Sequence, residues 1–185
     1  MQDPHEIVAP AGSPLAAAVL STADLDGALQ FYCDRLGFDA GPVRIWRDPV
    51  LAVLTGGPPD TAARACLLSS GGDIVGRILL LQFVDATGHD VPGERIQRAS
   101  NSRAVGLANL NFYVADMRAA IVEFRELGYE FWTDPTLHNM SDAVGKPIEV
   151  LFDGPDGVVI NFVELASNDP STRIGQMRAY VERHG

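Results

Sequence analysis

Residues 17–38 read AAVLSTADLDGALQFYCDRLGF, and residues 109–129 read NLNFYVADMRAAIVEFRELGY. Each stretch is a short apolar run, then an aspartate followed by Leu or Met, then a helix-like pattern closed by Leu-Gly-aromatic. When Asp24 is placed on Asp116, apolar residues of the two stretches coincide at the spacing i, i+3, i+4, i+7, which is one face of an α-helix. A repeat of this length predicts two copies of one strand–helix unit.

The two predicted helices have recognisable ends. Asp24 and Asp116 stand where an N-cap side chain accepts backbone N–H bonds, and Gly37 and Gly128 stand where a C-cap glycine takes a positive φ. Three extended segments follow each helix: FDAGPVRIW (38–46), RACLLSS (64–70) and GRILLLQFV (76–84), then YEFWT (129–133), KPIEVLF (146–152) and VVINFVEL (158–165). The order predicts an α+β chain with two βαβββ modules.

The rest of the chain is divided around these modules. We expect a flexible tail over 1–14, modules over 15–85 and 105–166, a polar linker over 86–104, and a C-terminal helix over 167–185. Pro49, followed by an apolar run and a Gly-Gly-Pro-Pro stop, predicts one further short helix in the first module.

Composition excludes some partners. The chain of 185 residues has a formal net charge of −10 and a single lysine, so it lacks the clustered cations that nucleic acid binding needs. No apolar run approaches the ~20 residues of a membrane span, and the N-terminus shows no signal peptide. Cys33 and Cys66 are predicted to be free thiols, which favours a cytoplasmic protein.

Two motifs resemble those of the vicinal oxygen chelate superfamily, which includes glyoxalase I, extradiol dioxygenases, methylmalonyl-CoA epimerase, and the fosfomycin and bleomycin resistance proteins. The first is D-L-x-x-A-L-x-F-Y-x-x-x-L-G-F from Asp24 to Phe38, and the second is the Pro155-Asp156-Gly157 turn before the last strand. The resemblance implies that the two modules form a cup-shaped mixed sheet with a small-molecule site on its inner face. We also expect a homodimer.

The resemblance further implies four positions for metal ligands, which in this chain are Ala17, Gln82, Asn109 and Asn161. Alanine cannot ligate, and amide oxygens are weak neutral donors, whereas catalytic divalent ions take imidazole or carboxylate ligands. We therefore expect neither a metal nor another cofactor.

Polar residues remain on the predicted inner face. Alternation along a strand groups Asn109 with Asn111 and Tyr113 on one side of the first strand of the second module. Asparagine is depleted in strands, so two in mid-strand need a reason. Either the amides pair with one another in a buried seam, or they hold a carbonyl or hydroxyl of a ligand.

Glu149 is the candidate proton-transfer residue. The family's register turns Glu149 and Leu151 towards the cup, and apolar neighbours would raise the pKa of this carboxyl towards neutrality, as a general base requires. The alternative is an edge residue facing solvent. Trp132 is either a stacking surface or core, and His138 and Asp142 lie on a loop that either reaches the cup or is solvated. The predicted substrate-binding residues are Gln82, Asn109, Asn111, Tyr113, Trp132, His138, Asp142, Leu151 and Asn161.

Three functions follow, in this order. The first is a metal-independent isomerase, cyclase or lyase that transfers a proton through Glu149 on a hydrophobic, oxygenated small molecule, such as a secondary metabolite. The second is a binding protein that sequesters a drug, like the bleomycin resistance proteins. The third is a metal-dependent enzyme of the glyoxalase or dioxygenase type.

Overall fold

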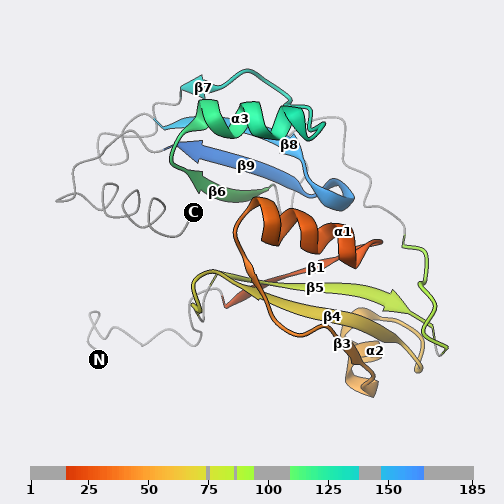
Figure 1. Ribbon diagram of the computed structural model, residues 1–185. Helices are drawn as coiled ribbons and strands as arrows, with labels where there is room; N and C mark the ends of the chain where they lie inside the picture. The colour runs from red at the N-terminus through yellow and green to blue at the C-terminus, as the bar shows by residue number, and fades with distance from the viewer. Residues whose placement is uncertain (1–15, 74–75, 86, 94–108, 138–146, 165–185) are drawn as a thin grey trace, which may run out of the picture.

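The computed structural model describes residues 16–73, 76–85, 87–93, 109–137 and 147–164 (Figure 1). Its first sheet has the order β1-β5-β4-β2, with β3 also paired to β4. The β1 strand runs parallel to β5, and the other pairs are antiparallel. The strands are β1 (Ala17–Ser21), β2 (Asp39–Ala40), β3 (Arg44–Trp46), β4 (Ala62–Ser69) and β5 (Arg77–Val84).

The second sheet repeats this plan with the order β6-β9-β8-β7. Again the first strand pairs in parallel with the last, and the other pairs are antiparallel. The strands are β6 (Leu110–Val114), β7 (Thr136–Leu137), β8 (Ile148–Asp153) and β9 (Val159–Glu164). The predicted α+β class with a repeated unit is confirmed, and each copy contributes a mixed sheet of its own.

The two repeated helices begin directly after the predicted N-cap residues. The α1 helix (Leu25–Leu29) starts after Asp24, whose side chain accepts the Gly27 N–H at 3.0 Å, and continues as a π-helical segment, η1 (Gln30–Arg35). The α3 helix (Met117–Glu126) starts after Asp116, which accepts the Ala119 N–H at 2.9 Å. None of the helices in the described part of the chain is long and apolar enough to cross a membrane.

The predicted helix stripes form one core. Both α1 and α3 lie on the same side of their sheets, with β1 and β6 at the facing edges (Figure 1). Leu25 and Tyr32 of the first unit and Met117 and Phe124 of the second belong to a single buried cluster. The ring of Phe31 packs edge-on against Phe124 at 6.1 Å between centroids, so the two units share apolar contacts.

The short helix predicted at Pro49 is α2 (Pro49–Thr55), and it covers the opposite side of the first sheet. Asp48 caps it by accepting the Val50 N–H at 2.8 Å. Leu51 is 1% exposed and packs with Ala63 and Leu81, which alternate along β4 and β5 with residues of the main core. We call the face of each sheet that is turned away from α1 and α3 the inner face.

A turn of the second unit holds a loop of the first. Asp156, in the 3-10 turn η2 (Pro155–Gly157), has φ of 56°, a left-handed conformation that aspartate tolerates better than most residues. Its Oδ1 accepts the Ala23 N–H at 3.2 Å. The Pro-Asp-Gly motif therefore also connects the two units next to the start of α1.

Candidate functional site

The inner face of the second sheet is set by the strand register. Ile160 and Phe162 of β9 are buried in the core on the α3 side, so Asn161 between them points to the inner face. Directly paired residues share a face, and Asn161 is flanked by Asn111 on β6 and Leu151 on β8. The next row pairs Tyr113, Val163 and Glu149.

Three of the predicted residues form one hydrogen-bonded cluster. The Asn161 Nδ2 donates to Asn111 Oδ1 at 3.1 Å and to Glu149 Oε2 at 2.8 Å. We call Asn111, Asn161 and Glu149 the amide–carboxylate cluster. An ionised carboxylate only accepts hydrogen bonds, so Glu149 fixes which end of the Asn161 amide faces it. Glu149 is therefore bonded to Asn161, and it is half-buried on β8.

The other end of the same amide lacks a partner. Asn161 is 4% exposed, and its Oδ1 is a buried acceptor that receives no hydrogen bond from the described residues. A buried polar atom left in this state costs about 1–3 kcal/mol, so such atoms in native proteins need an explanation. The cluster therefore combines two Asn161 N–H donors that are both used with a buried acceptor that has no partner among the described residues.

The residues around the cluster are aromatic and acidic. Trp132 is 45% exposed; its backbone N–H donates to Leu151 O at 2.9 Å and its Nε1 to Asp153 Oδ2 at 3.2 Å. Asp153 and Glu149 lie on the same face because they alternate along β8. Trp132 is thus placed beside the inner face and is not part of the core.

The remaining predicted residues divide into two groups. Asn109, immediately before β6, is half-buried, and Tyr113 is 40% exposed. Both alternate with Asn111 towards the inner face. His138 and Asp142 lie outside the described residues.

The expected place of Gln82 on the inner face is wrong. Gln82 is 3% exposed and points to the α1 side, where its Oε1 accepts from Arg64 Nη1 at 2.9 Å and from the Leu25 N–H at 3.4 Å. Its Nε2 donates to Ala23 O at 3.0 Å. Gln82 therefore links the start of α1 to the sheet, and it is not a neighbour of the amide–carboxylate cluster.

The true counterparts in the first sheet follow from the pairing. Val19 pairs with Leu79 as Asn111 pairs with Asn161, and Leu67 pairs with Leu79 as Leu151 pairs with Asn161. Val19 is 59% exposed and Leu67 is 39% exposed, although both lie in strands. Sequence reasoning missed these two residues, and the alternation of exposed and buried apolar side chains along β1 and β4 is the signal that identifies them.

The residues present do not fit a catalytic divalent metal. The inner face of β6, β8 and β9 offers neutral amides and two carboxylates. Glu149 Oε2 is already bonded to an amide N–H, and Asp153 Oδ2 accepts from Trp132 Nε1. Ala17 supplies no donor atom, and the described residues contain no cluster of three His, Cys, Asp or Glu side chains. Transition metals in enzymes are held by imidazole, thiolate and carboxylate ligands that converge on one point.

Two open hollows lie on the helix side of the molecule. One, of about 630 Å³, runs along α3 past Arg118, Arg125 and Asp134, and the other, of about 600 Å³, runs along α1. Glu164 borders the first hollow, but its Oε2 already accepts the Met117 N–H at 2.6 Å. Neither hollow contains a residue of the amide–carboxylate cluster, so chemistry and not concavity identifies the candidate site.

Solved structures with the same fold are numerous. The chain is similar to a glyoxalase family protein from Bacillus cereus, with a TM-score of 0.62, 16% identity, and coverage of 88% of this chain and 99% of that one. It is also similar to a glyoxalase/bleomycin resistance protein/dioxygenase superfamily member from Sphaerobacter thermophilus DSM 20745 (TM-score 0.50, 19% identity, 82% and 97% covered). A third structure is TnmS3, an antibiotic binding protein from Streptomyces sp. CB03234 (TM-score 0.50, 18% identity, 85% and 100% covered).

A search of curated proteins finds no match to this chain. The structural similarities show the fold and leave the activity open, because one scaffold carries many functions. The model of one family, however, matches residues 15–162, which is most of the chain. The chain belongs to the Glyoxalase/Bleomycin resistance protein/Dioxygenase superfamily.

Proposed function

We propose that the chain binds a small organic molecule on the inner face of its second sheet, and that Glu149 accepts a proton from it. The protein would then be a metal-independent isomerase, cyclase or lyase. The observation that supports this proposal is the buried Asn161 Oδ1, which receives no hydrogen bond from the described residues beside a carboxylate that the same amide orients.

Two contacts support Glu149 as the proposed base. One carboxylate oxygen, Oε2, is held by the Asn161 N–H, which leaves Oε1 for a proton from the ligand. A second atom, Asn161 Oδ1, accepts a hydrogen bond from the same ligand and fixes its position relative to that oxygen. In the proton transfer, a bond from the ligand to hydrogen breaks, Oε1 gains the proton, and Glu149 becomes neutral.

Deuterium exchange tests the proposal because it detects the proton transfer itself, whatever product the reaction forms. The protein is incubated in D₂O with a panel of hydroxylated and carbonyl-containing aromatic metabolites, and proton NMR follows the loss of ligand C–H signals. The Glu149→Gln variant keeps the shape of the side chain and loses the base. Its exchange rate, measured at saturating ligand, should fall by about 10²–10⁴.

Glu126→Gln provides the matched control. Glu126 is exposed at the end of α3, on the other side of the sheet, and this change removes the same charge. We expect Glu126→Gln to exchange like the parent. An undiminished exchange rate in Glu149→Gln would remove Glu149 from the mechanism.

A second candidate is sequestration of a drug-like molecule without turnover. Two observations favour it: the inner face exposes Val19 and Leu67, and the fold is shared with the antibiotic binding protein TnmS3. Calorimetric titration with planar antibiotics separates the candidates. Tight binding by both the parent and Glu149→Gln, with no exchange or conversion of the ligand, would favour sequestration.

The proposal also includes a homodimer. Size-exclusion chromatography with light scattering measures the mass directly. A mass of one chain of 19.8 kDa at micromolar concentration would contradict this part of the proposal.

A further inference from the structure

Beside Glu149, the atoms of the amide–carboxylate cluster that lack a partner among the described residues are acceptors, whereas the Asn111 Nδ2 donors lie on the far side of Asn161, on β6. Both Nδ2 protons of Asn161 are used, one by Asn111 Oδ1 and one by Glu149 Oε2. What remains next to Glu149 is an acceptor, Asn161 Oδ1, together with the second carboxylate oxygen. A ligand carbonyl or carboxylate would face oxygen atoms there, whereas an N–H or O–H group would satisfy them.

The charge of the inner face of the second sheet favours a cationic N–H donor over a neutral hydroxyl. On the inner face of strands β6 to β9, the charged side chains are the carboxylates Glu149 and Asp153, and none of the inner-face residues of those strands is Lys, Arg or His. The chain as a whole has a formal net charge of −10. Hydrogen bonds from a cation to a carboxylate are roughly twice as strong as bonds between neutral groups, so a cationic donor fits better than a hydroxyl.

The inner face of the first sheet is apolar at its centre, and its charged residues include Arg77 and Arg44, which pair with Ala17 and Ala65. At the positions equivalent to Asn111, Asn161 and Glu149, it carries Val19, Leu79 and Ala65. Val19 is 59% exposed on β1, which is an edge strand of the first sheet. Exposed apolar side chains next to a few polar groups are typical of small-molecule sites.

From these three observations we infer that the ligand is a protonated amine with an apolar body. Its ammonium group donates to Glu149 and to Asn161 Oδ1, and its apolar part lies against Val19 and Leu67 of the first sheet. The inference rests on the proposed small-molecule site and names its ligand class. It holds whether or not the ligand is turned over.

Three probes that differ in the charge of the head group test the inference. Naphthylethylamine, naphthylethanol and naphthylacetate have one apolar body and differ in the head group. Each is titrated into the ¹⁵N-labelled full chain, and the side-chain amide signals of Asn111 and Asn161 report binding at the inner face. We expect the amine to bind about tenfold or more tightly than the alcohol, which is the ratio for one added charged hydrogen bond, and the acid to bind weakest.

Two variants separate the head group from the body. Glu149→Gln should weaken the amine about tenfold and leave the alcohol within about threefold, whereas Glu126→Gln on α3 should change neither. Val19→Ser should weaken all three probes several-fold. Its matched control is Val122→Ser, at a residue 53% exposed on α3, which should bind like the parent.

Each result has one meaning. Preferential binding of the amine that disappears in Glu149→Gln supports the inference. Shifts of the Asn111 and Asn161 signals with equal affinities for the three probes, or with the acid strongest, overturn the amine and leave the proposed binding site intact. If none of the probes shifts those signals at millimolar concentration, both the inference and the site are wrong.

Discussion

Buried amides do two different things in the two halves of this chain. In the second sheet, Asn161 joins two neighbouring side chains and keeps a buried acceptor without a partner among the described residues. In the first sheet, the Gln82 amide is hydrogen-bonded to Arg64 and to backbone atoms at the start of α1. The same chemical group is thus a structural tie at one position and a candidate ligand contact at the other, and its partners decide which.

Gln82→Leu should test the structural assignment. The change leaves the Ala23 carbonyl and the Leu25 N–H without their side-chain partner, so we expect the free energy of unfolding to fall by about 2–4 kcal/mol. Urea denaturation measures this loss. Probe binding at the inner face should stay within about twofold under native conditions. Weakened binding in a stably folded variant would show that Gln82 belongs to the site after all.

Tyr32 is a second residue whose surroundings predict a measurable effect. Its side chain is 1% exposed, and its hydroxyl lacks a hydrogen-bond partner among the described residues. Burial, and to a lesser degree the negative charge of Asp156, raise the pKa of Tyr32 well above its ordinary value. The unfolded chain therefore releases this proton at lower pH than the folded one, so stability is full below about pH 10 and is lost as pH rises further.

Tyr32→Phe removes both the unpaired hydroxyl and the ionisation. We expect the free energy of unfolding at pH 7 to stay equal or to rise by up to about 2 kcal/mol, and its decline above pH 10 to become shallower. Tyr113→Phe, at a residue 40% exposed, is the control and should follow the parent. Unfolding curves at several alkaline pH values provide the measurement. A steeper alkaline loss in Tyr32→Phe would contradict the assignment.

Residue patterns predicted part of the site and failed at a definite point. Alternation within one strand grouped Asn111 with Asn109 and Tyr113, because the strand period of two needs only local sequence. The superfamily resemblance supplied Asn161. Gln82 was misplaced because LQFV was matched by letters to INFV, whereas the pairing register places Leu79 opposite Asn161. A shift of three residues reverses the face, and register depends on distant strands.

At the scale of the elements, the repeat could be predicted because helix caps and apolar stripes depend on residues that are close in the sequence. Asp24 and Asp116 cap their helices as predicted, and the stripe residues of α3 are buried. The switch of α1 to π-helical turns after Leu29 was not predicted, because a single inserted residue per turn leaves little trace in an apolar pattern. The sequence thus predicted that the two helices exist, but it did not predict the π-helical turns of the first one.

Phe124→Ala measures how much α3 contributes through its buried face. The Phe124 ring is 3% exposed and contacts the ring of Phe162 at 4.9 Å between centroids. Its removal should lower the free energy of unfolding by about 3–5 kcal/mol. Val122→Ala, two residues earlier and 53% exposed, should cost below about 0.5 kcal/mol in the same urea titration. Similar losses in both variants would mean that the stripe does not face the core.

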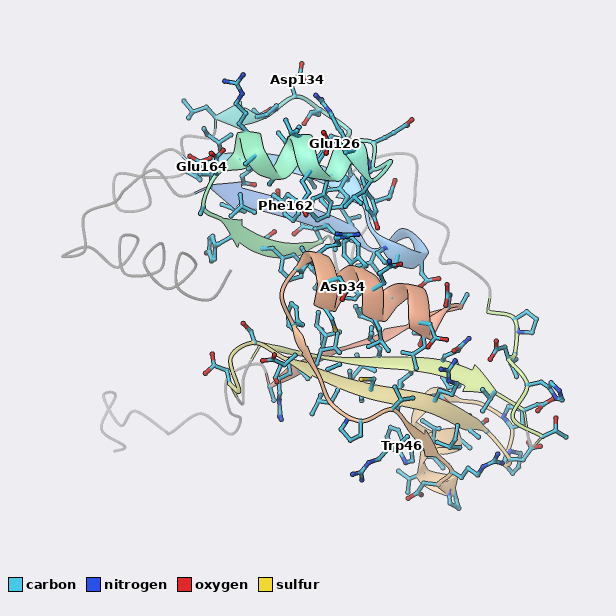
Figure 2. All side chains as sticks on the ribbon, viewed as in Figure 1. Asp34, Trp46, Glu126, Asp134, Phe162 and Glu164 are labelled. Atoms are coloured by element: carbon cyan, nitrogen blue, oxygen red, sulfur yellow. The ribbon has the colours of Figure 1, made fainter. Side chains whose placement is uncertain are left out.

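At the scale of the whole molecule, the two copies of the repeat behave as one body. The main core cluster includes Leu80 from the first sheet and Phe162 from the second, and the side chains in Figure 2 fill the space between the sheets around α1. Neither unit can expose its helix face without also exposing the other's. The Asp156–Ala23 hydrogen bond adds a polar contact across the same boundary.

This shared core predicts a single unfolding transition, and the two tryptophans of the chain can test it. Trp46 packs with the small cluster under α2 in the first unit, and Trp132 bonds to Asp153 in the second. In Trp132→Phe the fluorescence therefore reports the first unit, and in Trp46→Phe it reports the second. Because separating the units would expose aromatic rings such as Phe31 and Phe124, we expect each variant's fluorescence midpoint in urea to coincide with its circular dichroism midpoint, as two-state unfolding requires. Fluorescence and circular dichroism midpoints that differ within one variant would show that the units unfold separately, and that the aromatic contacts between α1 and α3 contribute little to stability.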